Sequence, residues 1–174
     1  MINKAVFLDR DGVLNKDKVD YVYTVEEFKI FDGVADALSL LKNAGFKLII
    51  ITNQSGIAKG VYDEKAVYTC FEYLQSQTGH LIDDMYFCPH HPDYDIRCEC
   101  RKPGSAMIFE AIIKYEIDAA KSFMVGDAQR DITAGNNAGL RSIHVNNGKE
   151  AAVGAIHSVS DLLEAARYIL DNSK

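Results

Sequence analysis

Short apolar runs alternate with helical patterns along most of this chain, and the alternation limits the folds it can adopt. Residues 46–51 are apolar at every position except Lys47, which is typical of a parallel strand buried on both faces. Shorter strands are expected at residues 5–8, 85–88, 123–125 and 142–145. Strands that alternate with helices predict an α/β fold, a doubly wound parallel sheet with helices on both faces.

Helices are expected between these strands, because apolar residues recur there at helical spacing. Asp32 and Asp63 are predicted to cap the first two helices, and Gly45 and Gly79 to end them. Cys70 falls on the apolar side of the second helix, so it is expected in the core. Further helices are expected near residues 108–115, 131–137 and 162–169.

Length and charge restrict the kinds of protein this chain can be. Its 174 residues, 48% of them hydrophobic, predict a single domain over residues 1–174. The net charge of -6 argues against nucleic acid as a partner, because nucleic-acid binding needs a basic surface. The N-terminal apolar run is too short to act as a signal peptide or to span a membrane, so a cytoplasmic protein is expected. No long apolar stripe is left unassigned, which favours a monomer.

Polar clusters directly follow three of the expected strands. These are DRDG at 9–12, TNQSG at 52–56 and GDAQRD at 126–131. Parallel strands bind ligands at their carboxyl ends, so the three clusters are expected to meet at one edge of the sheet. Four acids would then lie together and would repel one another without a cation. Carboxylate oxygens suit Mg²⁺, and the candidate magnesium residues are Asp9, Asp11, Asp127 and Asp131.

A second metal site is expected in the segment 88–100, which reads CPHHPDYDIRCEC. Three thiolates and one imidazole form the closed tetrahedral site of a structural Zn²⁺. The predicted zinc ligands are Cys88, His90, Cys98 and Cys100, with His91 as the alternative imidazole. The loop has little apolar content, so zinc binding would order it. Zinc would thereby fix the backbone just before Arg101 and Lys102, two cations expected to face a phosphate.

Four motifs in the order DRDGV, ITN, RKP and GDAQRD, over about Lys4–Gly148, resemble those of the haloacid dehalogenase (HAD) superfamily. The resemblance implies a magnesium-dependent phosphatase in which Asp9 is the nucleophile and forms an aspartyl-phosphate. Asp11 would be the general acid and base, and its backbone carbonyl would join Asp9 and Asp127 on Mg²⁺.

The same resemblance implies roles for the remaining motif residues. Thr52 and Lys102 would hold the phosphoryl oxygens where charge is redistributed in the transition state. Asp131 would either support Asp127 or orient Lys102.

The zinc loop and the segment TNQSGIAKG narrow the resemblance to the D-glycero-D-manno-heptose 1,7-bisphosphate 7-phosphatase family. This family serves nucleotide-heptose and lipopolysaccharide core synthesis, and its pattern favours His90 over His91 as the zinc ligand. The related histidinol-phosphate phosphatases share the zinc loop and remain the alternative. Ala128 stands where a lysine can contact the substrate in the family, so that contact is expected to be absent.

Substrate binding is assigned to two groups of residues. A small flap at residues 15–23 stands in place of a large cap domain, and Asp17, Asp20 and Tyr21 on it are candidates to bind sugar hydroxyls. An open site of this kind suits a small phosphorylated sugar. The other candidates lie in the motifs themselves: Asn53, Gln54, Ser55 and Arg101.

Two further functions are less consistent with the sequence. A nucleic-acid 3′-phosphatase would need a basic groove with stacking aromatic residues, whereas this chain is acidic and has no Trp. An inactive, zinc-stabilised binding protein would be expected to have lost Asp9 or Asp11, and both are present.

Overall fold

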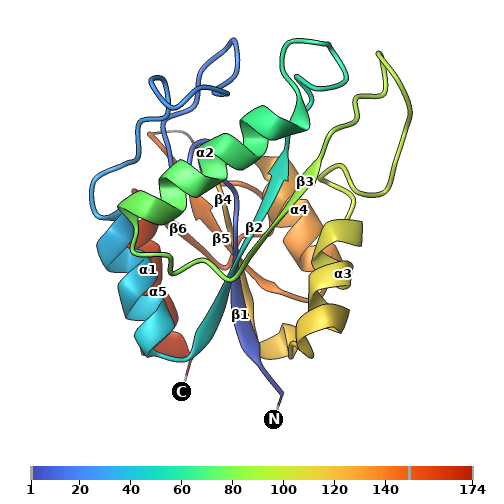
Figure 1. Ribbon diagram of the computed structural model, residues 1–174. Coiled ribbons are helices and arrows are strands. Elements are labelled where there is room, and N and C mark those ends of the chain that lie inside the picture. The colour runs from blue at the N-terminus through green and yellow to red at the C-terminus, as the bar shows by residue number, and fades with distance from the viewer. Residues whose placement is uncertain (1, 149, 174) are drawn as a thin grey trace.

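The computed structural model describes residues 2–148 and 150–173, which form one parallel sheet between two layers of helices (Figure 1). The strand order is β3-β2-β1-β4-β5-β6, and every pair of neighbouring strands is parallel. The strands are β1 (Lys4–Leu8), β2 (Phe46–Asn53), β3 (Asp84–Cys88), β4 (Phe123–Gly126), β5 (Arg141–Val145) and β6 (His157–Val159). This is the predicted doubly wound sheet.

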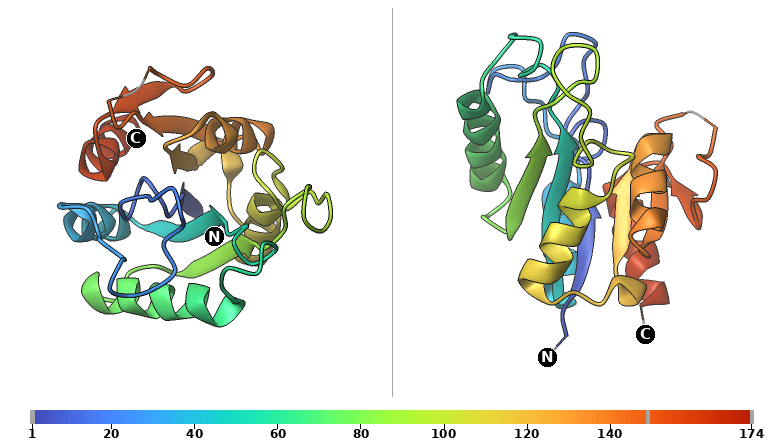
Figure 2. Two further views of the ribbon diagram at one scale, coloured as in Figure 1. Left: turned by 90° about the horizontal axis from the view of Figure 1, so that it is seen from above. Right: turned by 90° about the vertical axis from the view of Figure 1, so that its right-hand side faces the viewer.

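Helices cover both faces of this sheet, as Figure 2 shows from two further directions. The helices are α1 (Val34–Asn43), α2 (Glu64–Gln77), α3 (Ala106–Tyr115), α4 (Gln129–Asn137) and α5 (Leu162–Asn172), with a short 3-10 turn at Ala119–Lys121. Helices α1, α2 and α5 pack over one core cluster, while α3 and α4 cover the other. Within the described residues, no helix combines the length and apolarity needed to cross a bilayer.

Alternation along β1 divides its side chains between the two cores. Val6 and Leu8 belong to the cluster under α1, α2 and α5, whereas Ala5 and Phe7 belong to the cluster under α3 and α4. All four side chains are fully buried. Because successive side chains of a strand point to opposite faces, a central strand must be apolar throughout, and this explains the continuous apolar pattern in the sequence.

Most predicted elements are present, and the differences are local. Asp63 caps α2 as predicted, since its carboxylate accepts a hydrogen bond from the Ala66 amide. The Asp32 cap was wrong, because α1 starts after Gly33, whose φ of 78° lies in the left-handed region and which makes no side-chain cap bond. The sequence prediction also lacked β6, which has only three residues, one of them buried.

The strand order places β1 between β2 and β4, and this arrangement locates the site. The chain leaves β1 toward β2 on one side and reaches β4 on the other, so the crevice outside the carboxyl ends of these strands is open to a ligand. Asp9 follows β1, Thr52 lies near the end of β2, and Asp127 follows β4. The three predicted polar clusters therefore meet at one edge.

Candidate active site

Lys102 lies at the centre of this edge and is 2% exposed. Its ammonium nitrogen is 2.8 Å from Asp9 Oδ1 and 2.8 Å from Asp131 Oδ1. It also donates a hydrogen bond of 2.7 Å to the carbonyl oxygen of Ile51 in β2. One buried cation thus joins residues that follow β1, begin α4 and lie within β2.

Burial strongly affects the ionisation of Asp9 and of Lys102. Desolvation is the largest cause of the raised pKa of Asp9, which is about 7; the charge of Asp131 also raises this pKa, and Lys102 opposes the rise. Burial lowers the pKa of Lys102, but the charges of Asp131 and Asp9 more than offset this, and its pKa ends above the usual value. Lys102 is therefore charged, and it stabilises the ionised form of Asp9.

Asp131 forms an ion pair with Lys102, and orienting this lysine is one of the two roles predicted for it. Its Oδ1 atom pairs with the ammonium group, and its Oδ2 atom accepts a hydrogen bond of 3.0 Å from the Ala128 amide at the start of α4. Gly126 leaves room for it, since a Cβ atom there would come 2.2 Å from the Asp131 Cβ.

A divalent cation fits the same carboxylates. Oxygen atoms of Asp9, Asp127 and Asp131 all lie within 4.8 Å of one another, and hard oxygen donors suit Mg²⁺. Gly12 keeps this space open: its φ is 87°, and a Cβ atom there would lie 2.3 Å from Asp127 Oδ2. Among the described residues, the Asp11 carboxylate is not part of this group.

The Asp11 carboxylate instead faces a set of hydrogen-bond donors. Arg10 binds it in two places, at 2.9 Å from Nη2 to Oδ1 and 3.1 Å from Nε to Oδ2. Asn15 donates to Oδ1 at 2.9 Å and Gln54 to Oδ2 at 3.2 Å. The sequence analysis assigned no role to Arg10, which is 2% exposed. The position of Arg10 inside a motif that directly follows a buried strand was the feature of the sequence that could have indicated its role.

Asn53 and Arg101 attach the segment that carries Lys102. The Asn53 side chain donates to the Lys102 carbonyl at 3.1 Å and accepts from the Lys102 amide at 3.0 Å. Arg101 donates to the backbone carbonyl of His90 at 3.2 Å. In this structure the Asn53 side chain therefore fixes the backbone of Lys102, although it was predicted as a substrate ligand.

A cavity of about 280 Å³ opens beside these residues. The predicted substrate residues on its wall are Asp17, Tyr21, Asn53, Gln54, Ser55 and Arg101, whereas Asp20 does not line it. Arg130, from the first turn of α4, also lines the cavity and was missed by the sequence analysis. Burial opposes its charge, but Asp131, Asp9 and Asp127 raise its pKa. The sequence analysis considered only the acids of this motif and therefore overlooked its arginine.

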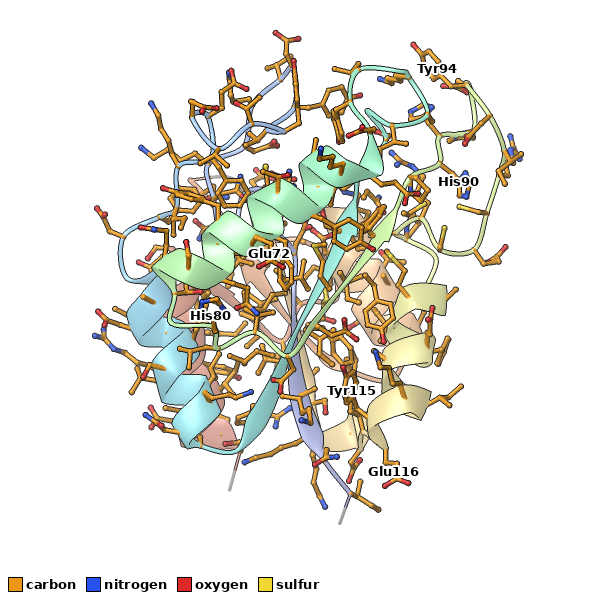
Figure 3. The ribbon with its side chains drawn as sticks, viewed as in Figure 1. Glu72, His80, His90, Tyr94, Tyr115 and Glu116 are labelled. Atoms are coloured by element: carbon orange, nitrogen blue, oxygen red, sulfur yellow. The ribbon has the colours of Figure 1, made fainter. Side chains whose placement is uncertain are left out.

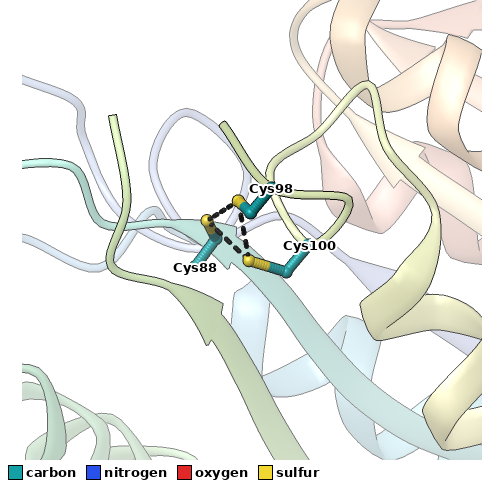
Figure 4. A group of neighbouring side chains, drawn as sticks. All are labelled: Cys88, Cys98 and Cys100. Carbon is teal, nitrogen blue, oxygen red and sulfur yellow. Dashed lines mark hydrogen bonds between the residues drawn. The ribbon is translucent and has the colours of Figure 1, made fainter. Parts of the chain in front are cut away.

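Three of the four predicted zinc ligands lie together (Figure 4). Cys88 Sγ is 3.4 Å from Cys98 Sγ, and Cys100 Sγ is 3.0 Å from each of them. His90 lies on the loop that follows β3 (Figure 3), and its Nδ1 atom is 2.7 Å from Asp95 Oδ2. Among the described residues, no histidine joins the sulfur cluster as the structure stands.

Comparisons with known proteins agree with this geometry. A family model described as HAD-hydrolase-like matches residues 99–172. The chain is 40% identical over 179 residues to D-glycero-beta-D-manno-heptose-1,7-bisphosphate 7-phosphatase of Haemophilus influenzae, covering 98% of this chain and 93% of that protein. The protein of the same name from Escherichia coli K12 is 37% identical, with coverage of 94% and 93%.

A solved structure gives the same result at the level of the fold. The D,D-heptose 1,7-bisphosphate phosphatase from B. bronchiseptica, complexed with magnesium and phosphate, superposes with a TM-score of 0.84. It is 29% identical, and the match covers 97% of this chain and 98% of that one. The chain belongs to the heptose-bisphosphate phosphatase family. The predicted HAD-type fold and phosphatase class are confirmed.

The contribution of the central ion pairs to the stability of this heptose-bisphosphate phosphatase family member can be measured with a variant of Lys102. Lys102→Met keeps most of the side-chain volume but leaves Asp9 and Asp131 buried without their cation. We expect the free energy of unfolding at pH 8, without added metal, to fall by about 3–5 kcal/mol. Urea denaturation followed by circular dichroism measures this.

Lys114→Met is the matched control, since Lys114 pairs with Asp84 at 2.8 Å on the surface. This variant should keep a urea midpoint close to that of the wild type, because exposed ion pairs contribute little. Equal midpoints for the two variants would contradict a central role for Lys102.

Proposed function

We propose that the protein removes the 7-phosphate of D-glycero-D-manno-heptose 1,7-bisphosphate through an aspartyl-phosphate on Asp9, in nucleotide-heptose and lipopolysaccharide core synthesis. The relatives' names support this substrate over histidinol phosphate. The observation that carries the proposal is the position of Lys102, which is held between Asp9 and Asp131 and directly follows Arg101 of the cavity wall. This arrangement places a fixed positive charge next to the nucleophile.

The proposed reaction has two steps. In the first step, a carboxylate oxygen of Asp9 bonds to phosphorus, the bond from phosphorus to the sugar oxygen breaks, and Asp11 supplies the proton of the leaving alcohol. In the second step, Asp11 accepts a proton from water, which attacks phosphorus and releases phosphate from Asp9. Lys102 and the Thr52 hydroxyl hold the phosphoryl oxygens during both steps.

Magnesium would be held by Asp9, Asp127 and the backbone carbonyl of Asp11. Bound there, Mg²⁺ neutralises charge on the transferring phosphoryl group. The solved relative that contains magnesium and phosphate supports this assignment, as does the grouping of carboxylate oxygens in the present chain.

The charge of the cavity wall supports a substrate with two phosphates. Arg101 and Arg130 both line the cavity, and guanidinium groups suit phosphate because their planar donors match its oxygens. Asp131, Asp9 and Asp127 raise the pKa of Arg130, so this arginine lines the cavity as a cation. Histidinol phosphate carries an ammonium group in place of a second phosphate, which this wall would repel.

A structural zinc on Cys88, Cys98, Cys100 and His90 completes the proposal. The close approach of the three sulfur atoms supports it, because three cysteines and one histidine form a typical ligand set of structural Zn²⁺. Zinc would order the loop whose backbone carbonyl at His90 binds Arg101. A cytoplasmic location and a monomeric state remain predictions of the sequence.

The first test of the function compares two substrates with added Mg²⁺. We expect kcat/KM for the heptose 1,7-bisphosphate to exceed that for histidinol phosphate by about 100-fold or more, because the arginines of the cavity wall attract a second phosphate and repel an ammonium group. Steady-state release of phosphate measures this. Asp9→Asn should abolish turnover of both substrates, and a preference for histidinol phosphate would overturn the proposed substrate.

The raised pKa of Asp9 predicts a pH-dependent effect of magnesium on stability. Without metal, protonation of Asp9 stabilises the folded state at low pH, and this contribution is lost as the pH rises through about 7. Mg²⁺ must displace that proton. We therefore expect saturating Mg²⁺ to raise Tm more at pH 8 than at pH 5.5, measured by calorimetry.

Asp9→Asn serves as the control for this effect, because it removes the titrating group. Its smaller magnesium shift should be the same at both pH values. Equal shifts at pH 8 and pH 5.5 in the wild type would contradict the assignment of Asp9 as a magnesium ligand.

The zinc assignment predicts the metal content of cysteine variants. Cys98→Ser should lose the bound zinc and unfold more readily, because metal binding orders the loop. Cys70→Ala should keep it, since Cys70 is buried in the core on α2. Elemental analysis by mass spectrometry measures the zinc content, and comparison of His90→Ala with His91→Ala identifies the fourth ligand. Full zinc content in Cys98→Ser would contradict the assignment.

A further inference from the structure

The Gln54 side chain connects the proposed catalytic groups to a tyrosine outside the recognised motifs. Its amide nitrogen donates to Thr52 Oγ1 at 2.8 Å and to Asp11 Oδ2 at 3.2 Å. Its amide oxygen accepts a hydrogen bond of 2.7 Å from the Tyr62 hydroxyl. Gln54 is almost fully buried, so these three partners determine which way its amide faces.

The orientation of this amide has chemical consequences at both catalytic residues. If the amide were reversed, its oxygen would face the Asp11 carboxylate, and two acceptors would then lie together without a donor. In the observed orientation the Thr52 hydroxyl accepts from Gln54, which leaves its own proton for a phosphoryl oxygen. The reaction therefore requires the orientation in which the NH₂ group of Gln54 faces Asp11 and Thr52.

Packing holds Tyr62 in place. Its ring stacks on Tyr23 with centroids 5.1 Å apart and planes at 13°, and it meets the edge of Tyr21 at 5.9 Å. On another side it lies against Gly56, where an added Cβ atom would be 2.1 Å from the Tyr62 ring. Burial raises the pKa of Tyr62 to about 12, so its hydroxyl remains a donor at neutral pH.

We propose that Tyr62 is a positioning residue, whose hydroxyl fixes the Gln54 amide so that its NH₂ group holds Asp11 and Thr52 for phosphoryl transfer. The ring contacts with Tyr21 and Tyr23 connect this arrangement to the flap at residues 15–23. The inference rests on the proposed function, in which Asp11 and Thr52 act on the phosphoryl group.

The test is a double-mutant cycle on kcat with an aryl phosphate as substrate, which does not depend on recognition of a sugar. Tyr62→Phe removes only the hydroxyl, and we expect kcat to fall about 3- to 10-fold, the effect of one hydrogen bond. KM should stay close to the wild-type value. In a Gln54→Ala background the same change should have no further effect, because the hydroxyl has lost its partner.

Tyr23→Phe is the matched control. It removes a phenol hydroxyl from the same stack, and among the described residues no hydrogen bond is made by that hydroxyl. Its effect on kcat should be small and the same in both backgrounds. A loss in Tyr62→Phe that persists in Gln54→Ala, or a kcat within about 2-fold of the wild type, would overturn the proposal.

A second measurement separates this inference from the function itself. The same cycle, followed by urea unfolding, reports the coupling between Tyr62 and Gln54 without any substrate. If the wild type turns over the aryl phosphate but not the heptose bisphosphate, the proposed substrate fails and the cycle still decides the role of Tyr62. If the wild type has no phosphatase activity, additive effects on unfolding would overturn the inference, and a shared effect would confirm the contact.

Discussion

The buried ammonium group of Lys102 is the interaction on which the rest of the site depends. It lies 2.8 Å from Asp9 and 2.8 Å from Asp131, and it is also bonded to the carbonyl of Ile51. Burial and the charge of Asp131 raise the pKa of Asp9 to about 7 even with Lys102 beside it, and without Lys102 the ionised carboxylate would be less favourable still. A nucleophile must be ionised to attack phosphorus, so Lys102 has an electrostatic role even before a substrate binds.

Several segments position Lys102, because a long and flexible side chain adopts one conformation only when its neighbours restrict it. Asn53 at the end of β2 binds both backbone groups of Lys102. Arg101, the preceding residue, is attached to the cysteine loop through the His90 carbonyl. Gly126 and Gly12 leave the space that Asp131 and Asp127 occupy. The motifs thus supply the contacts and the space that hold Lys102 and the nearby acids at the edge of the sheet.

The sequence predicts the parts of this structure that depend on periodic burial and on strand ends. The fully apolar pattern of β2 and the cap at Asp63 follow from local rules, and both are present. The three-residue strand β6 could not be predicted, because a single buried residue does not produce a periodic pattern of apolar residues. Gly33 replaces Asp32 as the cap since the chain enters α1 in a left-handed turn, which no residue pattern specified.

Within the site, the sequence identifies charged groups more readily than their partners. Asp9, Asp127 and Lys102 follow from motifs, and the structure brings them together. Arg10 was missed because a buried arginine is unusual and only the fold reveals that it binds Asp11 in two places. Hydrogen-bond partners depend on which side chains meet across distant segments, and motif spacing carries no such information.

The contrast between Asp9 and Asp11 shows how one short motif supplies two different carboxylates. Asp9 is buried beside Asp131, pairs with Lys102 and accepts a hydrogen bond from the Arg10 amide. Asp11, two residues later, is partly exposed and accepts hydrogen bonds from Arg10, Asn15 and Gln54. Nucleophilic attack suits a fixed, desolvated oxygen, whereas proton transfer requires a group that can reach the leaving oxygen and then water. The hydrogen bond from Gln54 therefore has a functional consequence, because it helps to orient a proton-transfer group that is only partly buried.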